Sequence, residues 1–586
     1  MKSLTRLSAA CIAWNKAFFK ENRLLLLIIL VGLALRFSGV FWGLPFIKHM
    51  RFYHPDESKI IDGAYEYPVH ILTNLDLRYP TAFHYTLGIL TLPLRLISYP
   101  KDYYTIYLVG RLLSVLAGAA AILVLFLLSR KIFHRRTALL ASFLVAFSML
   151  HVANSAWATT DVLSSLLLSL FLLLLLNMLE TETRRAAILT GISLGFLVGV
   201  KYTGAIAVIP LGYLFFSRHL RRFYLKSDPV RSIWTSFTSL VRDRNLWIVL
   251  LVALGTFLLS TPGLLRHPFA FIASLQYEGG RLSNSYLPIN RPETYAILFN
   301  SLSRAAGIPL AVTAILGIIL AIFRKKVVLL ALILMLLVFV LYFGSAMEDR
   351  YYILIMPVLA LFAGSFLSFF IDLGSLPVKG LYPSHAEFSD AEHPQHKTVR
   401  MNWIRIAGYV LTGLVCIYGF LYSLGAVISR YPDSRTQAAR YIAENVPPSS
   451  SIGLGFASKD YEHSWHYPRI DSKVYEKSNF IKHPDFIVLS SYDYESIRET
   501  LSRGILNPDY SLPREYWGEW YLSSPPTAAI FQLNEQLWLG TSPEYCLLKK
   551  FPPRKLYAPI EFPAPTIELY LRQDTGVAGS STCEIP

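Results

Sequence analysis

The sequence predicts a polytopic α-helical membrane protein with a small α/β domain at its carboxyl end. Hydrophobic residues make up 53% of the 586 residues and charged residues only 16%, which is not the composition of a water-soluble globule. Apolar runs long enough to cross a hydrocarbon core of about 30 Å recur along the chain. The region after residue 430 instead contains short strand-like segments.

About eleven apolar runs have the length of a membrane span. They begin near Arg23, Ile106, Thr137, Val162, Ala186, Tyr202, Leu246, Ile308, Val327, Tyr352 and Ile404. The first run is long and lacks a small-residue cleavage site, so we expect a retained helix rather than a signal peptide. Residues 81–97 are apolar but short and contain His84, Pro93 and Arg95, which favours an interfacial or re-entrant helix.

Basic residues predict the orientation, because short cytoplasmic loops collect lysine and arginine. Clusters of them precede the first run and follow the second, fourth, sixth and eighth runs. We therefore expect a multi-pass protein with a cytoplasmic amino terminus. Residues 1–430 would form the transmembrane domain, with outer loops at 47–104 and 264–306, and residues 431–586 would form a non-cytoplasmic domain. If residues 81–97 crossed the membrane, every later loop would change sides.

Other functional classes find little support. The net charge is +16, but most of the clustered charge lies in the predicted cytoplasmic loops, so topology explains it without nucleic acid. The sequence contains no glycine-rich phosphate loop, zinc-type cysteine spacing or nucleophile elbow. Cys546 and Cys583 share the predicted outer side, and whether they pair is left open.

The first outer loop contains an adjacent acidic pair, Asp56 and Glu57, preceded by His54 and followed by Lys59. A carboxylate within reach of an acceptor can take its proton, so Asp56 is the candidate base and Glu57 its partner. His54 is a second candidate base, although a histidine before proline can simply shape the turn. The two carboxylates could instead hold a divalent metal.

Further ionisable and aromatic residues lie at the ends of other predicted spans on the same side. Taken singly, each could do no more than anchor a helix at the headgroups. Their joint placement favours a site for a lipid phosphate. The candidates are Asp161, Lys201, Tyr202, Arg266, His267, Glu278, Arg281, Asp349, Arg350 and Tyr351.

The ordered set of motifs resembles the integral-membrane glycosyltransferases of the GT-C fold, the group that includes protein O-mannosyltransferases and the lipid A aminoarabinose transferase. The resemblance covers roughly residues 20–430. The motifs are Asp56-Glu57, Tyr79-Pro80, residues 158–161, residues 199–204, residues 260–262, and Asp349-Arg350-Tyr351 followed by residues 354–357.

The resemblance implies transfer of a sugar from a polyprenyl-phosphate donor to a lipid, glycan or protein acceptor outside the membrane. Asp56 would be the base with Glu57 as partner, and Lys201 and Arg350 would bind the donor phosphate. The other candidates, including His54 and Lys59, would contact substrate. The group implies metal-independent transfer without a cofactor. The chain departs from eukaryotic O-mannosyltransferases in lacking their repeated outer modules.

The main alternative from another class is a transporter or flippase of a lipid-linked saccharide. Such proteins place ionisable residues near the bilayer midplane, often in the broken helices of paired repeats. Here the ionisable residues lie at the outer ends of the predicted spans, and no internal repeat is evident. A polysaccharide polymerase or ligase is an alternative within the enzymes.

The carboxyl-terminal region carries local signals of a small α/β domain. Residues 436–445 read as an amphipathic helix, and two prolines follow them. Residues 451–456 and 486–490 are short apolar segments typical of buried strands.

Overall fold

The computed structural model describes most of the chain. The described residues are 22–44, 54–70, 74, 76–97, 103–224, 228–284, 292–343, 349–373, 394–454, 468, 470, 474–478, 483–491, 533, 536–537, 539–553 and 566–573. The chain divides into two compact units, one of residues 1–40 and 59–424 and one of residues 41–58 and 425–586. The predicted boundary after residue 430 stays a prediction, and the acidic pair Asp56 and Glu57 falls in the second unit.

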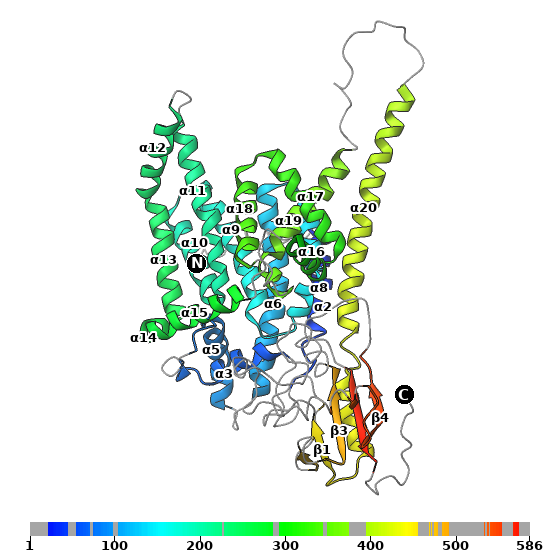
Figure 1. Cartoon of the computed structure of the whole chain (residues 1–586). Helices are drawn as coiled ribbons and strands as arrows, with labels where there is room; N and C mark the ends of the chain where they lie inside the picture. Colours follow the sequence, from blue (N-terminus) through cyan, green and yellow to red (C-terminus); the bar gives the residue numbers. More distant parts are fainter. Residues whose placement is uncertain are drawn as a thin grey trace, which may run out of the picture. The chain divides into compact units, whose positions relative to one another are not determined.

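Helices dominate the chain, as predicted, and every predicted apolar run coincides with helix (Figure 1). The helices before residue 201 are α2 (Arg23–Phe37), α3 (Pro55–Tyr65), α5 (Ala82–Ile97), α6 (Tyr103–Ile132), α7 (Arg135–Ala146), α8 (Met149–Asn154), α9 (Thr160–Thr181) and α10 (Arg184–Val200). They continue with η1 (Tyr202–Ala207), α11 (Val208–Phe223), α12 (Pro229–Val241), α13 (Arg244–Ser260), α14 (Gly263–Arg266), α15 (Pro268–Asn284) and α16 (Pro292–Ala306). The last are α17 (Ile308–Arg324), α18 (Val327–Phe343), η3 (Asp349–Tyr351), α19 (Tyr352–Leu373), α20 (Pro394–Ile428) and α21 (Ser434–Asn445).

The number of membrane crossings is not confirmed. Within the described residues, four helices are long and apolar enough to cross, lying in α6, α9, η3 with α19, and α20. The number rises to six if the bent pairs α12–α13 and α16–α17 each count as one span. The short apolar segment predicted at 81–97 is helix α5. The count of eleven stays a prediction.

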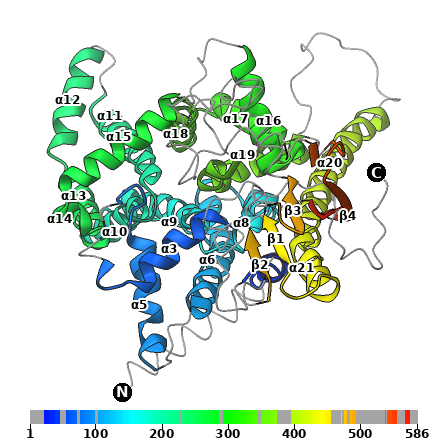
Figure 2. The ribbon, with the colours of Figure 1, turned by 60° about the horizontal axis from the view of Figure 1, so that its bottom comes forward.

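Helix α19 lies inside the first unit. It packs against α7, α9 and α17, and most of its residues are buried. Helices α17 and α19 lie side by side in both views of the ribbon (Figure 2). Gly317 of α17 meets the backbone of Phe362 in α19, so the two helices touch without an intervening side chain. Small residues permit this close approach, and the resulting van der Waals packing favours association of helices in a membrane.

Helices α10 and α13 are joined by a stripe of glycines. Gly191, Gly195 and Gly199 recur at every fourth position of α10, and each faces α13 or the residue that ends it. A Cβ atom at Gly195 would clash with the carbonyl oxygen of Ala253. The spacing is that of small residues in close membrane-helix pairs. The pairing therefore positions the carboxyl end of α10, where Lys201 follows.

We expect Gly195→Ala to destabilise the protein by about 1–3 kcal/mol, the usual cost of overpacking a tight contact. The matched control is Gly255→Ala in α13, because nothing lies within 4 Å of its added Cβ. That control should be neutral or stabilising, since alanine favours helix over glycine by about 1 kcal/mol. Thermal unfolding in detergent measures both variants. Equal melting temperatures would contradict the close-packing argument.

The second unit contains a five-stranded sheet. Its strands are β1 (Ser451–Leu454), β2 (Glu476–Ser478), β3 (Phe486–Ser490), β4 (Tyr545–Phe551) and β5 (Ile567–Arg572). The order is β2-β1-β3-β5-β4, with β1 parallel to β2 and β3, and β5 antiparallel to β3 and β4. The α/β character predicted for this region is present in the second unit; its outer location is not confirmed.

Both faces of this sheet are covered. Helix α21 supplies Ala438 and Ile442 to a core that includes Val488 and Leu569. Ile487 belongs to a second cluster on the other face. Every residue of β3 is buried, which fits its continuous apolar sequence and central place in the sheet. Cys546 in β4 is disulfide-bonded, whereas Cys583 lies outside the described residues.

Trp42 connects the segment 41–44 to the start of α21 inside the second unit. Its indole Nε1 donates to Asp433 Oδ2 at 3.0 Å, and Arg435 donates from Nε and Nη2 to the same carboxylate at 2.9 and 2.6 Å. The guanidinium groups of Arg430 and Arg435 lie 5.5 and 5.7 Å from the Trp42 ring centroid. These buried contacts explain why residues 41–58 belong to this unit.

Candidate functional site

The acidic pair lies in the first turn of α3. Asp56 is half-buried, whereas Glu57 and His54 are fully buried. The Asp56 backbone N–H donates to His54 Nδ1 at 3.1 Å, and the Glu57 N–H donates to the His54 carbonyl at 3.2 Å. His54 therefore caps the helix, and its Nδ1 is already an acceptor. Between the two carboxylates, Asp56 is the one that a substrate can reach.

The rest of this loop contains an ion pair that the sequence analysis missed. Arg78 binds Asp76 through Nε at 2.7 Å and Nη2 at 2.5 Å. This partner lowers the pKa of the Asp76 carboxyl below its ordinary value, so the group stays ionised in mild acid. The Arg78 guanidinium lies 5.2 Å from the Tyr277 ring centroid, and Lys59 Nζ lies 4.9 Å from that of Tyr79.

Asp161 and Lys201 meet in a buried ion pair in the first unit. Asp161 lies in the first turn of α9, and Lys201 directly follows α10, where the helix gives way to η1. Lys201 Nζ donates to Asp161 Oδ1, and the two side chains are 16% and 7% exposed. Burying these two charges is costly unless they are paired, so the ion pair offsets part of the cost of burying each side chain.

Tyr351 lies beside both residues that were predicted to bind the donor phosphate. Lys201 Nζ is 5.5 Å from the Tyr351 ring centroid, and the Arg350 guanidinium is 5.9 Å from it. Arg350 and Tyr351 belong to η3, directly before α19. A ring that attracts two cations keeps their positive charge in one place. The structure thus brings together Asp161, Lys201, Arg350 and Tyr351.

Tyr202 connects η1 to the loop before α5. Its hydroxyl donates to the Leu77 carbonyl oxygen at 2.9 Å. The Tyr202 ring contacts Phe257 of α13 and Phe271 of α15 edge-on, at 6.3 and 5.7 Å between centroids. Tyr202 therefore orients the backbone next to Lys201, and its hydroxyl is already engaged.

Asp349 is bound by residues of α16 and not by Lys201 of the Asp161–Lys201 pair. Ser301 Oγ donates to Asp349 Oδ1 at 2.6 Å, and Arg304 donates from Nε and Nη2 at 2.9 and 3.0 Å. The bidentate arginine neutralises the carboxylate and orients it. Asp349 consequently supports η3, where Arg350 lies.

The remaining predicted residues lie in and around α14 and α15. Arg266 is exposed at the end of α14, and His267, half-buried, follows it. Only the backbones of Glu278 and Arg281 are described, and both lie within α15. The contacts described for these residues do not define a role.

A buried arginine network was also missed. Arg36 of α2 donates from Nη1 to the Ala146 carbonyl at 2.8 Å and from Nη2 to that of Val145 at 3.1 Å. Its Nη2 also bonds His151 Nδ1 at 3.0 Å, and His151 Nε2 lies 2.9 Å from Ser165 Oγ. Because His151 accepts from arginine, its proton lies on Nε2 and the ring is neutral. A charged residue inside the first apolar run was the available signal.

The part of the chain that the structure describes contains no group of three or more histidine, cysteine, aspartate or glutamate side chains suited to a metal ion. Metal-independent transfer was predicted from the family resemblance, and it stays a prediction.

Residues 107–241 match the family model of dolichyl-phosphate-mannose-protein mannosyltransferases. No curated protein matches the sequence. Three similar solved structures have TM-scores below 0.5. The apo oligosaccharyltransferase of Archaeoglobus fulgidus has 15% identity and a TM-score of 0.45 over 76% of this chain and 64% of that chain, just under two thirds of its length.

ArnT from Cupriavidus metallidurans, solved with undecaprenyl phosphate, has 14% identity and a TM-score of 0.46 over 81% of this chain and 94% of that chain. The Pmt1-Pmt2 protein O-mannosyltransferase complex of S. cerevisiae, solved with the sugar donor, has 16% identity and a TM-score of 0.33 over 43% and 34%.

Over residues 107–241, the family match agrees with the predicted resemblance to protein O-mannosyltransferases. The segment of this chain that matches the mannosyltransferase model contains Asp161, Lys201 and Tyr202.

Proposed function

We propose that the protein transfers a sugar from a polyprenyl-phosphate donor to a lipid, glycan or protein acceptor on the outer face of the membrane. The buried Asp161–Lys201 pair carries this proposal, because it lies within the segment that matches the mannosyltransferase family. A lysine held in a largely buried site next to a second cation suits a phosphodiester anion. A lysine that only anchored a helix at the lipid headgroups would be exposed and would not need a buried carboxylate as its partner.

The leaving group would be handled by Lys201 and Arg350. Transfer breaks the bond between the anomeric carbon and a phosphate oxygen, and the electron pair stays on the phosphate. The departing polyprenyl phosphate gains negative charge, which nearby cations stabilise more than they stabilise the intact donor. Asp161 would neutralise Lys201 while no donor is bound and share it once the phosphate arrives.

The acceptor would be activated by Asp56. An attacking hydroxyl or amine must lose its proton, and a carboxylate within hydrogen-bond reach can take it. The half-buried position of Asp56 leaves it accessible, whereas the full burial of Glu57 suits a supporting role. His54 would act as the helix cap.

Substrate contacts by the other candidates are part of the same proposal. Lys59 of α3 contacts the Tyr79 ring, Tyr202 of η1 donates to the Leu77 carbonyl, and Asp349 of η3 accepts from Ser301. Arg266, His267, Glu278 and Arg281, from the segment that contains α14 and α15, are proposed as further substrate-binding residues.

The purified chain, incubated with a panel of polyprenyl-phosphate sugars and envelope lipids, glycans or peptides, should release polyprenyl phosphate together with a glycosylated acceptor. Mass spectrometry measures both products. The control is the double variant Asp161→Asn/Lys201→Met, which removes both buried charges and should release neither product. A chain that moves fluorescent lipid-linked saccharide across vesicles without breaking its phosphate bond would instead be a flippase, and the enzyme proposal would be wrong.

A further inference from the structure

Helix α12 presents an apolar face to its surroundings. The residues of this face are exposed and lie on the side of α12 opposite its buried serines, which is called the outer face of α12 and does not refer to a side of the membrane. They are Val230, Ile233, Trp234, Phe237 and Val241, with exposed fractions of 75, 53, 67, 49 and 48%. Their spacing of three, four and seven positions places them on one side of a helix. The Trp234 and Phe237 rings stack at 6.2 Å between centroids. At 13 residues, α12 is too short to cross a bilayer, which takes about 20.

The opposite side of α12 is polar and packed against the protein. Ser232 and Ser236 are 1% and 0% exposed, and α12 packs against α11. A helix that faced water would turn its serines outward and its tryptophan inward. The reversed arrangement indicates that the surroundings of the outer face are apolar.

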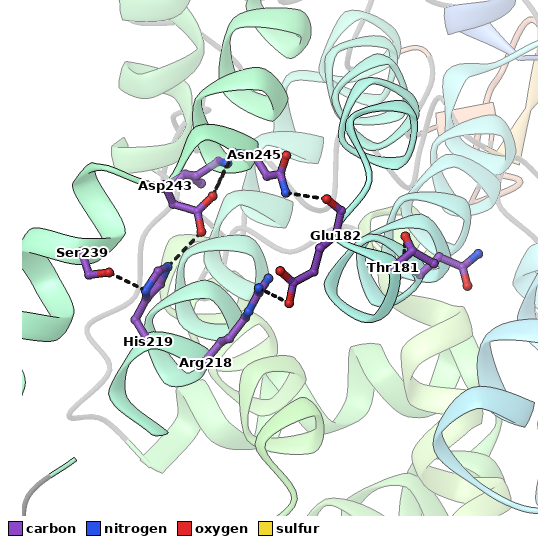
Figure 3. A network of polar contacts seen from close by, with 9 residues as sticks. Thr181, Glu182, Arg218, His219, Ser239, Asp243 and Asn245 are labelled. Atoms are coloured by element: carbon purple, nitrogen blue, oxygen red, sulfur yellow. Dashed lines mark hydrogen bonds and ion pairs between the residues drawn. The ribbon is translucent and has the colours of Figure 1, made fainter. Parts of the chain in front are cut away.

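A polar network holds α12 in this orientation (Figure 3). Ser239 Oγ of α12 lies 3.0 Å from His219 Nδ1 of α11, and His219 Nε2 lies 2.9 Å from Asp243 Oδ2. Asp243 also accepts from the Asn245 backbone N–H at 2.8 Å, which caps α13. The side chains of His219 and Asp243 are 7% and 13% exposed. Three helices are therefore joined, and α12 cannot rotate without breaking these bonds.

Exposed arginines lie on α12 and on the segments next to it in the chain. They are Arg221 and Arg222 of α11, Arg231 of α12, Arg242 directly after α12, and Arg244 at the start of α13. The nearby carboxylates are engaged: Asp228 caps α12, Asp243 caps α13, and Glu182 pairs with Arg218. The apolar face is thus bordered by a surplus of positive charge.

We propose that the outer face of α12 lies in the interfacial layer of the bilayer and that its arginines bind anionic phospholipid headgroups. The apolar side chains would enter the acyl region, as in amphipathic helices that lie flat on membranes. The arginines would meet the phosphates at the same depth. Helix α13 supports this, because it follows α12 after a bend of 49° and is itself apolar. A soluble protein partner would explain the exposed apolar face of α12, but it would not explain the arginines beside that face or its continuation into the apolar helix α13.

The depth of α12 in the bilayer can be measured on the full chain in nanodiscs that contain one chain per disc. A cysteine replaces Phe237 after Cys11 and Cys416 are changed to serine, and it carries an NBD fluorophore. Emission should be blue-shifted, and iodide should quench it at least fivefold less than NBD at a matched Glu180→Cys site, because Glu180 has a side chain that is 61% exposed. The chain without the new cysteine is the labelling blank. Equal quenching at both positions would overturn the proposal.

The preference of the chain for anionic lipids tests whether the arginines near α12 bind lipid headgroups. Spin-labelled phosphatidylglycerol should associate with the chain several-fold more than phosphatidylcholine, and high salt should reduce that preference. The variant Arg231→Gln/Arg242→Gln should lower the preference at least twofold without changing the melting temperature or the elution volume. An unchanged preference would overturn the lipid assignment. Blue-shifted NBD emission only in discs with two chains would assign the face to a second copy instead.

Discussion

Replacing Asp56 by asparagine is expected to lower the turnover number of sugar transfer by about 10²–10⁴-fold, the usual contribution of a general base. Asparagine keeps the shape of the side chain but cannot take a proton from the acceptor. Binding of the donor should be unchanged, because the proposed phosphate ligands are Lys201 and Arg350. Steady-state kinetics with saturating donor, together with a donor-binding titration, separate the two effects.

The matched control for this prediction is Asp62→Asn. Asp62 lies on the same helix, α3, and is half-buried like Asp56, so both variants lose one half-buried carboxylate of α3. We expect the control to retain most of the activity. Full activity of Asp56→Asn would rule out Asp56 as the base, and equal losses in both variants would indicate a general effect of charge on α3.

Removing Lys201 is expected to have the second large effect. Lys201→Met should lower kcat/KM for the donor by about 30-fold to several thousand-fold, since losing one partner of a buried charge pair costs about 2–5 kcal/mol and about 1.4 kcal/mol is tenfold. It should also destabilise the chain by about 3–5 kcal/mol, because it breaks the ion pair between Lys201 and the buried Asp161.

Two further variants separate folding from function at this pair. Asp161→Asn/Lys201→Met removes both charges and should recover most of the lost stability while remaining inactive. Lys131→Met breaks the exposed Lys131–Glu180 pair and should change stability by less than about 1 kcal/mol. Thermal unfolding and donor kinetics measure all three. If the double variant recovered activity along with stability, Lys201 would be purely structural.

Several elements of the fold were predictable because their signals are local. Every apolar run predicted from the sequence falls in a helix, and the strand predicted at 486–490 is β3. The helix predicted at 436–445 is α21, which begins two residues earlier, after the cap supplied by Asp433. The length and composition of a short apolar segment are enough to predict such elements. The number of crossings is different, since helices such as α11 and α18 are shorter than a typical span.

The site was predictable in part. The acidic pair was chosen by residue type and predicted side of the membrane, which are properties of the sequence, whereas the phosphate-binding role of Lys201 and Arg350 was taken from the family resemblance. The sequence analysis made Asp56 the base and Glu57 its partner, but it did not show that Asp56 is half-buried and Glu57 fully buried, and it missed the Asp76–Arg78 pair. Both depend on which way side chains turn once α3 and the loop after it are packed.

The sequence alone determined the class of protein: its apolar runs and the basic residues between them specify a helical membrane chain, and its ordered motifs indicate a glycosyltransferase. Only the tertiary structure decided which charges meet. Asp161 and Lys201 lie 40 positions apart and become partners because the glycines of α10 set its packing against α13 and α9 brings the carboxylate alongside. Neither charge could be buried there alone, so the pairing is a property of helix packing rather than of either segment.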